Sequence, residues 1–119
     1  MIHLGTDIVD IQRFAALLEK WDRRLVERLF TPQEIQYCER QAVPAIHYAG
    51  RFAAKEAVRK ALHAAGRRTT VPFLSIDIRR DDIGVPSATL ADQNDVRLSI
   101  SISHTDAIAI ATAMAEFHG

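Results

Sequence analysis

Asp7 is the first residue whose type and position suggest chemistry. It follows Gly5 and Thr6 within a run of mostly aliphatic residues from Ile2 to Val9. A carboxylate inside a buried strand is costly unless it is paired or binds a metal. Two interpretations follow: a metal or charged partner, or an ordinary strand-end aspartate that reaches solvent or caps the next helix.

The second candidate is the charged segment RFAAKEAVRK, which begins at Arg51. On a helix, Arg51, Lys55 and Arg59 form one basic stripe, because residues four apart are neighbours. Glu56 and Lys60 form the adjoining stripe. One interpretation is a solvated face with an ordinary Glu–Lys pair, worth about 0.2–0.5 kcal/mol. The other is a site for a phosphate-rich ligand with a metal, since several cations surround a single carboxylate.

The third candidate is the sequence Ser103-His104-Thr105-Asp106, which lies between two expected strands. It is not a Ser-His-Asp triad, because adjacent residues in one turn cannot adopt triad geometry. These residues either make an ordinary turn or place hydroxyls, backbone N–H groups and an imidazole against a phosphate. Together, the three candidates are compatible with an anionic, phosphate-bearing ligand and Mg²⁺.

The elements that must position these residues begin with a strand over residues 2–9, which we expect to be buried. Asp10 can cap a following helix, whose apolar side chains recur with 3.6-residue spacing as far as Trp21. Thr31 and Glu34 are spaced as a capping box, which predicts a second helix start.

A long helix is predicted from Pro44 to about Gly66, with a face of small residues. This face consists of Ala49, Ala53, Ala57, Ala61, Ala64 and Ala65. Beyond it, alternation with period two predicts strands over about 74–79, 87–91, 98–103 and 108–115. The last two form a predicted hairpin with one small and one bulky face, the helix packing on the small one. The fold class is therefore α+β, an antiparallel sheet packed against a long Ala-rich helix.

Length and composition limit the classes of protein that remain. At 119 residues, the chain is expected to be a single domain, residues 1–119. Lys plus Arg and Asp plus Glu number 15 each, which argues against a general nucleic-acid or membrane-surface binder. The lone Cys38 excludes an internal disulfide and indicates a reducing compartment. The sequence shows neither a signal-peptide pattern nor an apolar run long enough to span a bilayer, so we expect a cytoplasmic protein.

The three candidates coincide with the pattern of the small holo-[acyl-carrier-protein] synthases, a class of 4′-phosphopantetheinyl transferases. The chain resembles this family over essentially its whole length. The motifs are Gly5-Thr6-Asp7-Ile8-Val9-Asp10-Ile11, Arg51-Phe52-Ala53-Ala54-Lys55-Glu56-Ala57 with Lys60-Ala61, and Ser101-Ile102-Ser103-His104-Thr105. Thr31-Pro32 with Glu34, and Gly84-Val85-Pro86, lie between them in the right order. The resemblance implies the phosphopantetheinyl transferase fold.

The activity implied by this resemblance moves the phosphopantetheine arm of coenzyme A to a serine of an apo acyl carrier protein. The reaction releases 3′,5′-ADP and serves fatty acid or polyketide synthesis. Asp7 and Glu56 would hold Mg²⁺ against the pyrophosphate, a donor set that suits this ion. Glu56, directly or through a metal-bound water, would accept the proton of the serine hydroxyl. Lys60 would stabilise the β-phosphate or the leaving group, so Asp7, Glu56 and Lys60 are the expected catalytic residues.

Contacts with coenzyme A are also implied by the resemblance. Arg51 and Lys55 match positions that contact its phosphates, as Lys60 does, and Pro86 would lie near the adenine. His104 and Thr105 match a loop that meets coenzyme A from a neighbouring subunit.

Family members are trimers with active sites between subunits, so the resemblance implies a homotrimer. The acidic carrier protein is received on the first helix. Arg13 matches a carrier-contacting arginine there, and Arg24 is expected to be a second one.

Three alternative functions compete with this one. A non-catalytic trimeric module that binds coenzyme A or a nucleotide would not need both Asp7 and Glu56. A metal-dependent phosphodiester hydrolase usually needs further His or Asp ligands, and the sequence shows no such cluster. A trimerising scaffold would leave Asp7 and the charged stripes without a role.

Two stretches depart from the family pattern. Many members have Gly-Thr-Gly after the central helix, where this chain has Ala64-Ala65-Gly66-Arg67-Arg68. Many also carry a helix where this chain has only the short connection Ala91-Asp92-Gln93-Asn94-Asp95. Neither change touches Asp7 or Glu56, so activity is expected to be retained.

Overall fold

The computed structural model describes residues 1–67 and 69–118, so Arg68 of the departing loop lies outside the described residues. The chain forms a strand, three helices, a short 3₁₀ turn and four further strands. Their bounds are β1 Ile2–Asp10, α1 Ile11–Leu29, α2 Pro32–Glu39, α3 Pro44–Ala64, η1 Phe73–Ser75, β2 Ile76–Arg80, β3 Pro86–Leu90, β4 Val96–His104 and β5 Ile108–Phe117. The predicted α+β class is confirmed.

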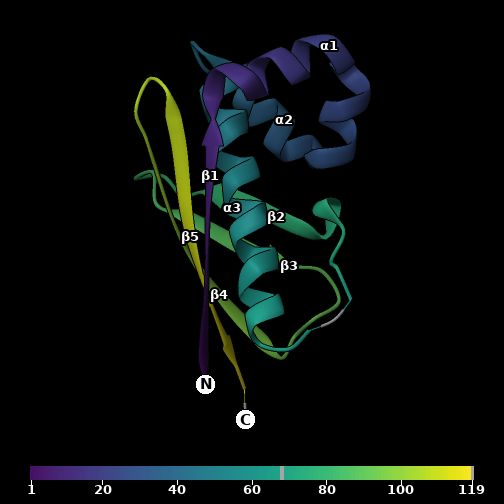
Figure 1. Ribbon diagram of the computed structural model, residues 1–119, viewed down its shortest axis with the longest axis vertical. Coiled ribbons are helices and arrows are strands. Elements are labelled where there is room, and N and C mark those ends of the chain that lie inside the picture. The colour runs from purple at the N-terminus through teal and green to yellow at the C-terminus, as the bar shows by residue number, and fades with distance from the viewer. Residues whose placement is uncertain (68, 119) are drawn as a thin grey trace.

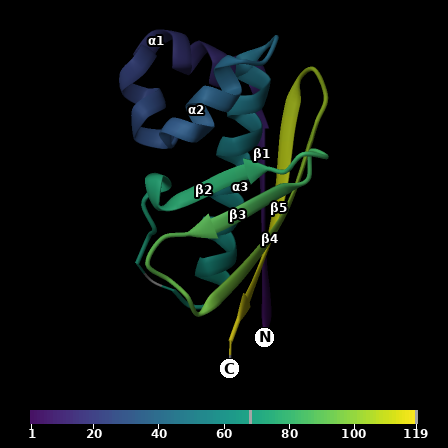
Figure 2. The same ribbon diagram turned by 180° about the vertical axis from the view of Figure 1, so that it is seen from behind.

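Helix α3 is the centre of the molecule. A three-stranded sheet of order β1-β5-β4 runs along one side of it, while α1 and α2 cover its N-terminal end (Figure 1). Seen from behind, the separate two-stranded sheet β2-β3 crosses α3 (Figure 2). All strand pairs are antiparallel, as predicted. Because α3 is covered by several elements, most of its middle section is buried.

The register of the three-stranded sheet determines which side chains face α3. Directly opposed residues share a face, and Ala113 of β5 lies between Gly5 of β1 and Ile100 of β4. The alanines of β5 are buried, whereas Thr112 shares the outer face with Ser101. The expectation of one small and one bulky face is therefore wrong. The register places the small residues of β5 beside the large aliphatic residues of β4.

Strand β1 is buried on one face only, which corrects the expectation of a buried strand. Gly5 and Val9 face inward, while Leu4 is 61% exposed and Ile8 is 62% exposed. Ile110 lies opposite Ile8 on the same outer face and is also exposed. The outer face of β1 and β5 is therefore an apolar surface in the isolated chain.

The predicted helix starts are confirmed by their hydrogen bonds. The backbone N–H of Arg13 donates to Asp10 Oδ1 over 3.0 Å at the start of α1. At the start of α2, Glu34 N donates to Thr31 Oγ1 over 3.3 Å and Thr31 N donates to Glu34 Oε1 over 2.7 Å. Helix α1 extends beyond the predicted end and is kinked at Asp22, whose φ of 54° is unusual for a non-glycine residue.

The two stretches that depart from the family pattern meet in the structure. Arg67, just after α3, forms an ion pair with Asp95 and a 3.3 Å hydrogen bond to Gln93 in the short connection before β4. The Arg67 guanidinium also lies 4.5 Å from the centre of the Phe117 ring. Across residues 1–67 and 69–118, no helix has the length and apolar character needed to cross a membrane.

Candidate active site

Strand β1 and helix α3 approach backbone to backbone at Gly5. A Cβ atom at this position would lie 2.5 Å from the Ala61 nitrogen and closer still to the Ala57 carbonyl oxygen. Only glycine permits this approach, because any side chain would displace the strand or the helix. Asp7 follows two residues later on the same face of β1, so the approach brings its carboxylate to the charged stretch of α3.

Asp7 and Lys60 form an ion pair where β1 meets α3. Lys60 Nζ lies 3.0 Å from Asp7 Oδ1 and donates a second bond, also 3.0 Å long, to the Thr6 carbonyl oxygen. The Asp7 side chain is 16% exposed, and that of Lys60 is 52% exposed. The partner of the carboxylate in the strand is therefore a lysine that remains open to a ligand.

Glu56 lies one helical turn before Lys60 and has a different cationic neighbour. Its Oε1 is 3.5 Å from Nη1 of Arg59, and its side chain is 29% exposed. Asp7, Glu56 and Lys60 thus present two carboxylates and an ammonium where β1 lies along α3. The Glu–Lys pair that helix spacing suggested is replaced by the pairs Asp7–Lys60 and Glu56–Arg59.

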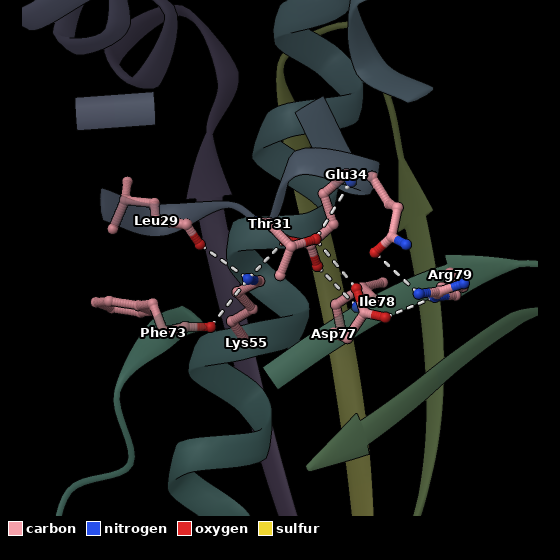
Figure 3. Close-up of polar contacts among 9 residues, drawn as sticks. Leu29, Thr31, Glu34, Lys55, Phe73, Asp77, Ile78 and Arg79 are labelled. Carbon is pink, nitrogen blue, oxygen red and sulfur yellow. Dashed lines mark hydrogen bonds and ion pairs between the residues drawn. The ribbon is translucent and has the colours of Figure 1, made fainter. Parts of the chain in front are cut away.

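Lys55 is an interior residue and does not lie on a solvated or ligand-facing stripe, as its spacing suggested. Its side chain is 0% exposed, and Nζ lies 2.7 Å from Glu34 Oε1. The ammonium also donates to the carbonyl oxygens of Leu29 over 2.8 Å and Phe73 over 3.0 Å, as Figure 3 shows. Burial lowers the pKa of Lys55, while the carboxylate of Glu34 opposes that shift. With three partners inside the fold, Lys55 has a structural role in place of the expected phosphate contact.

Arg51 is also buried, but its environment differs from that of Lys55. It is 2% exposed, and its guanidinium lies 4.1 Å from the centre of the Tyr37 ring. Within the described part of the chain, Arg51 Nε has no hydrogen-bond partner. A buried, unpartnered N–H of this kind can donate a hydrogen bond to an anion that reaches it.

The β4–β5 turn places His104 and Thr105 at the surface. Thr105 Oγ1 accepts hydrogen bonds from the backbone N–H groups of Ala107 and Ile108, each over 3.1 Å. His104 Nδ1 lies 3.1 Å from the Thr105 carbonyl oxygen. The Thr105 hydroxyl therefore caps its own turn in the isolated chain, and the exposed His104 ring is the freer of the two groups.

His47 of α3 belongs to the surroundings of Arg51, a relation that the sequence did not reveal. Its ring packs edge-on against Tyr37 at 5.9 Å between centroids. Burial, followed by the positive charges of Arg51, Arg80 and His104, lowers the pKa of His47. The N-terminal half of α3 therefore lies in a positive environment that suits an anionic ligand.

The remaining predicted residues, Arg13, Arg24 and Pro86, lie on α1 and β3. Arg13 and Arg24 are exposed on α1, on either side of the kink at Asp22. Arg24 lines a surface hollow of about 250 Å³ together with Trp21. Pro86 is half-buried at the first position of β3.

The donor set at this site fits Mg²⁺. Asp7 and Glu56 supply two partly exposed carboxylates, and Mg²⁺ typically combines one or two carboxylates with waters and substrate phosphates. Among the residues that the structure describes, no group of three or more His, Cys, Asp or Glu side chains forms a potential metal cage.

Sequence reasoning missed the role of Glu34 beyond its capping box. Its Oε2 also accepts a 2.7 Å hydrogen bond from the backbone N–H of Ile78, so one buried carboxylate joins α2, α3 and β2 (Figure 3). Nothing in local spacing signals a contact between residues that are 21 and 44 positions apart.

Comparisons with known proteins show which family the chain belongs to. The family model of the 4′-phosphopantetheinyl transferase superfamily matches residues 3–113. The holo-[acyl-carrier-protein] synthase of Geobacter sulfurreducens is 42% identical over 120 residues, covering 94% of each chain. That of Syntrophus aciditrophicus is 45% identical over 91 residues, covering 76% of this chain and 70% of its own. The ACPS–CoA complex of Chronobacterium ammoniagenes superposes with a TM-score of 0.87 at 28% identity, over 100% of this chain and 99% of the other. The chain therefore belongs to the 4′-phosphopantetheinyl transferase superfamily, among the holo-[acyl-carrier-protein] synthases.

Proposed function

We propose that this protein transfers 4′-phosphopantetheine from coenzyme A to a serine of an apo acyl carrier protein, with Mg²⁺, in fatty acid or polyketide synthesis. The observation that carries the proposal is the Asp7–Lys60 pair beside Glu56, in a fold shared with relatives named holo-[acyl-carrier-protein] synthase. Two carboxylates that could hold a metal ion and an ammonium that could stabilise phosphate charge suit a phosphoryl-type transfer.

In this reaction the serine oxygen forms a bond to the β-phosphorus of coenzyme A, and the bond from that phosphorus to the bridging oxygen breaks. The bridging oxygen leaves with 3′,5′-ADP. Glu56 accepts the serine proton, directly or through a water, because its carboxylate is partly exposed. Lys60 faces the departing phosphate with its ammonium, which Asp7 and the Thr6 carbonyl hold in place. When bound between Asp7 and Glu56, Mg²⁺ would supply charge neutralisation to the pyrophosphate.

Coenzyme A binding is assigned to the positive surroundings of the N-terminal half of α3. Arg51 supplies a buried guanidinium whose Nε lacks a partner within the described residues, and His104 supplies an exposed imidazole. Thr105 offers its backbone and a hydroxyl already engaged in the turn, and Pro86 offers an apolar surface for the adenine. One solved relative, a Helicobacter pylori holo-[acyl-carrier-protein] synthase, is described in complex with coenzyme A.

A homotrimer with active sites between subunits is part of the proposal. It is supported by the apolar outer face of β1 and β5, where Leu4, Ile8 and Ile110 remain exposed in the isolated chain. Burying such side chains stabilises an assembly by about 25 cal/mol for each Å² of apolar surface removed from water. In the trimer, His104 and Thr105 of one subunit would meet coenzyme A bound mainly by the next.

Arg13 and Arg24 are proposed to receive the acidic carrier protein. Both are exposed on α1, and the hollow beside Arg24 adds an apolar surface from Trp21, which is 47% exposed. A basic patch with an exposed aromatic residue suits an acidic protein partner.

The test is an intact-mass assay of an apo acyl carrier protein incubated with the purified chain and coenzyme A. We expect a mass gain of one phosphopantetheine with Mg²⁺ and none with EDTA. Asp7→Ala and Glu56→Ala should reduce transfer to at most a slow residual rate, while circular dichroism and light scattering show an unchanged fold and trimer. Glu27→Ala is the matched control, because it also removes a carboxylate paired with an arginine at 3.5 Å, but at an exposed position on α1.

The competing function is a non-catalytic module that binds coenzyme A. It predicts coenzyme A binding by calorimetry with no mass gain in any carrier protein. It also predicts that Asp7→Ala leaves the affinity for coenzyme A unchanged. Coenzyme A binding without a mass gain in several apo carrier proteins would replace the transferase proposal.

A further inference from the structure

Arg59 is held in place on α3 by two contacts with the segment before β2. Its Nε donates a 2.9 Å hydrogen bond to the Val71 carbonyl oxygen. Its guanidinium lies 3.4 Å from the centre of the Phe73 ring, so it stacks on that ring. The side chain is only 19% exposed, and its remaining nitrogens therefore point in a direction fixed by the fold.

The segment that holds Arg59 is itself anchored to the interior of the molecule. The Phe73 carbonyl oxygen accepts the 3.0 Å bond from Lys55 Nζ, one helical turn before Arg59 (Figure 3). Val71 is buried, and the Phe73 ring packs 5.5 Å from the ring of Phe52. The segment beneath the Arg59 guanidinium is therefore anchored to the buried Lys55 through the Phe73 carbonyl oxygen.

Arg59 in turn faces Glu56, the proposed base. Its Nη1 lies 3.5 Å from Glu56 Oε1, and the described residues give Glu56 Oε2 no hydrogen-bond or ion-pair partner. One oxygen of the carboxylate is thus directed by a fixed cation, while the other remains available.

We propose that Arg59 is a positioning residue: fixed by Val71 and Phe73, it orients the Glu56 carboxylate for the transfer reaction. The inference rests on the proposed function, because Glu56 must act in that reaction. A base that is already oriented raises the rate of the chemical step, because no entropy has to be lost to orient its carboxylate during the reaction.

An ordinary surface ion pair is the alternative explanation, and the chain contains one for comparison. Arg23 and Glu27 on α1 also lie 3.5 Å apart, but their side chains are 67% and 62% exposed. Such pairs contribute little, because two mobile side chains must be ordered to form them. Arg59 differs because the stacking contact and the carbonyl bond already order it.

The experiment measures kcat and KM for wild type, Arg59→Met, Arg59→Lys and the control Arg23→Met. Methionine keeps an apolar chain over Phe73 but removes the charge. We expect Arg59→Met to lower kcat by about tenfold or more, with the KM for coenzyme A unchanged within about twofold. Arg59→Lys should recover part of kcat, and Arg23→Met should leave kcat unchanged.

A double variant shows whether Arg59 acts through Glu56. In a Glu56→Gln background, whose slow residual transfer is followed by intact mass, adding Arg59→Met should cause no further loss of rate. If Arg59→Met lowers the rate in the Glu56→Gln background as much as it does in wild type, the proposal is overturned. It is also overturned if the lower kcat/KM of Arg59→Met comes from a higher KM for coenzyme A, which would assign Arg59 to substrate binding. An unchanged kcat in Arg59→Met also overturns it, as does a fall that follows only a loss of thermal stability. If wild type itself transfers nothing, the proposed function fails first, and this inference fails with it.

Discussion

The buried pair of Lys55 and Glu34 should be the most sensitive point of the fold. Both side chains are 0% exposed, and their charged atoms lie 2.7 Å apart. Lys55→Met would leave the Glu34 carboxylate buried without its cation and would remove the donor to the carbonyls of Leu29 and Phe73. Removing one partner of a buried ion pair typically destabilises a protein by about 3–5 kcal/mol.

Equilibrium urea unfolding and thermal unfolding measure this effect. For a domain of this size, a loss of that magnitude lowers the melting temperature by roughly 12–20 °C. Glu34 keeps two backbone donors, from Thr31 and Ile78, so we expect the lower part of the range for Lys55→Met. The control Arg23→Met removes one cation of an exposed pair and should change the free energy of unfolding by less than about 0.5 kcal/mol.

The double variant Lys55→Met with Glu34→Gln completes a cycle. Once the lysine is gone, a neutral glutamine should be better tolerated than the unpaired carboxylate, because no charge remains buried. We therefore expect the double variant to be more stable than the sum of the single losses predicts, by about 1–3 kcal/mol. Strictly additive losses, or a Lys55→Met variant within about 1 kcal/mol of wild type, would show that the pair does not anchor α3.

Three further predictions concern other parts of the molecule. Gly5→Ala should displace β1 from α3 and lower both the melting temperature and the rate of transfer. Gly50→Ala is the control: its added Cβ atom would come no closer than 3.2 Å to a neighbour, so thermal unfolding and the intact-mass assay should show only small losses. Burial raises the pKa of Cys38 from 9.0 to about 12, so the unfolded thiol ionises first and stability is lost as pH rises between these values. The difference in free energy of unfolding between wild type and Cys38→Ala should therefore fall by about 1 kcal/mol from pH 9 to pH 10, and no fall would contradict the buried thiol. Arg13→Glu should raise the KM for the carrier protein about tenfold and leave that for coenzyme A unchanged; equal effects on both would remove Arg13 from the docking surface.

Local patterns predicted most of the fold, because they depend on neighbouring residues alone. The cap at Asp10, the capping box at Thr31, helix α3 and the antiparallel strands all follow from spacing and turn chemistry. The kink at Asp22 was not predictable, since no glycine or proline marks it. The mixed face of the β4–β5 hairpin was missed for a similar reason, because register depends on how two strands align and not on either strand alone.

The candidate site was predictable only in part. The anomaly of Asp7 in an aliphatic strand pointed to a charged partner, and the structure supplies Lys60 at 3.0 Å. The pairing of Lys55 with Glu34 was not evident from helix spacing, because Glu34 reaches α3 from α2. Helix spacing allows Glu56 to pair with either Lys60 or Arg59, and it does not show that Val71 and Phe73 fix Arg59 beside Glu56.

The five charged residues of α3 lie on two adjoining helical stripes, and tertiary packing gives them different roles. Sequence spacing treats Arg51, Lys55 and Arg59 as equivalent positions on one face. In the fold, α2 and β2 cover that face, so Lys55 must find partners inside and Arg51 is left with an unpartnered Nε within the described residues. Arg59, nearer the edge, is stacked on Phe73 and faces Glu56, while Lys60 lies beyond the cover and stays half exposed. Depth beneath the covering elements, more than position in the stripe, therefore decides which charge supports the fold, which orients a neighbour and which remains free to meet a phosphate.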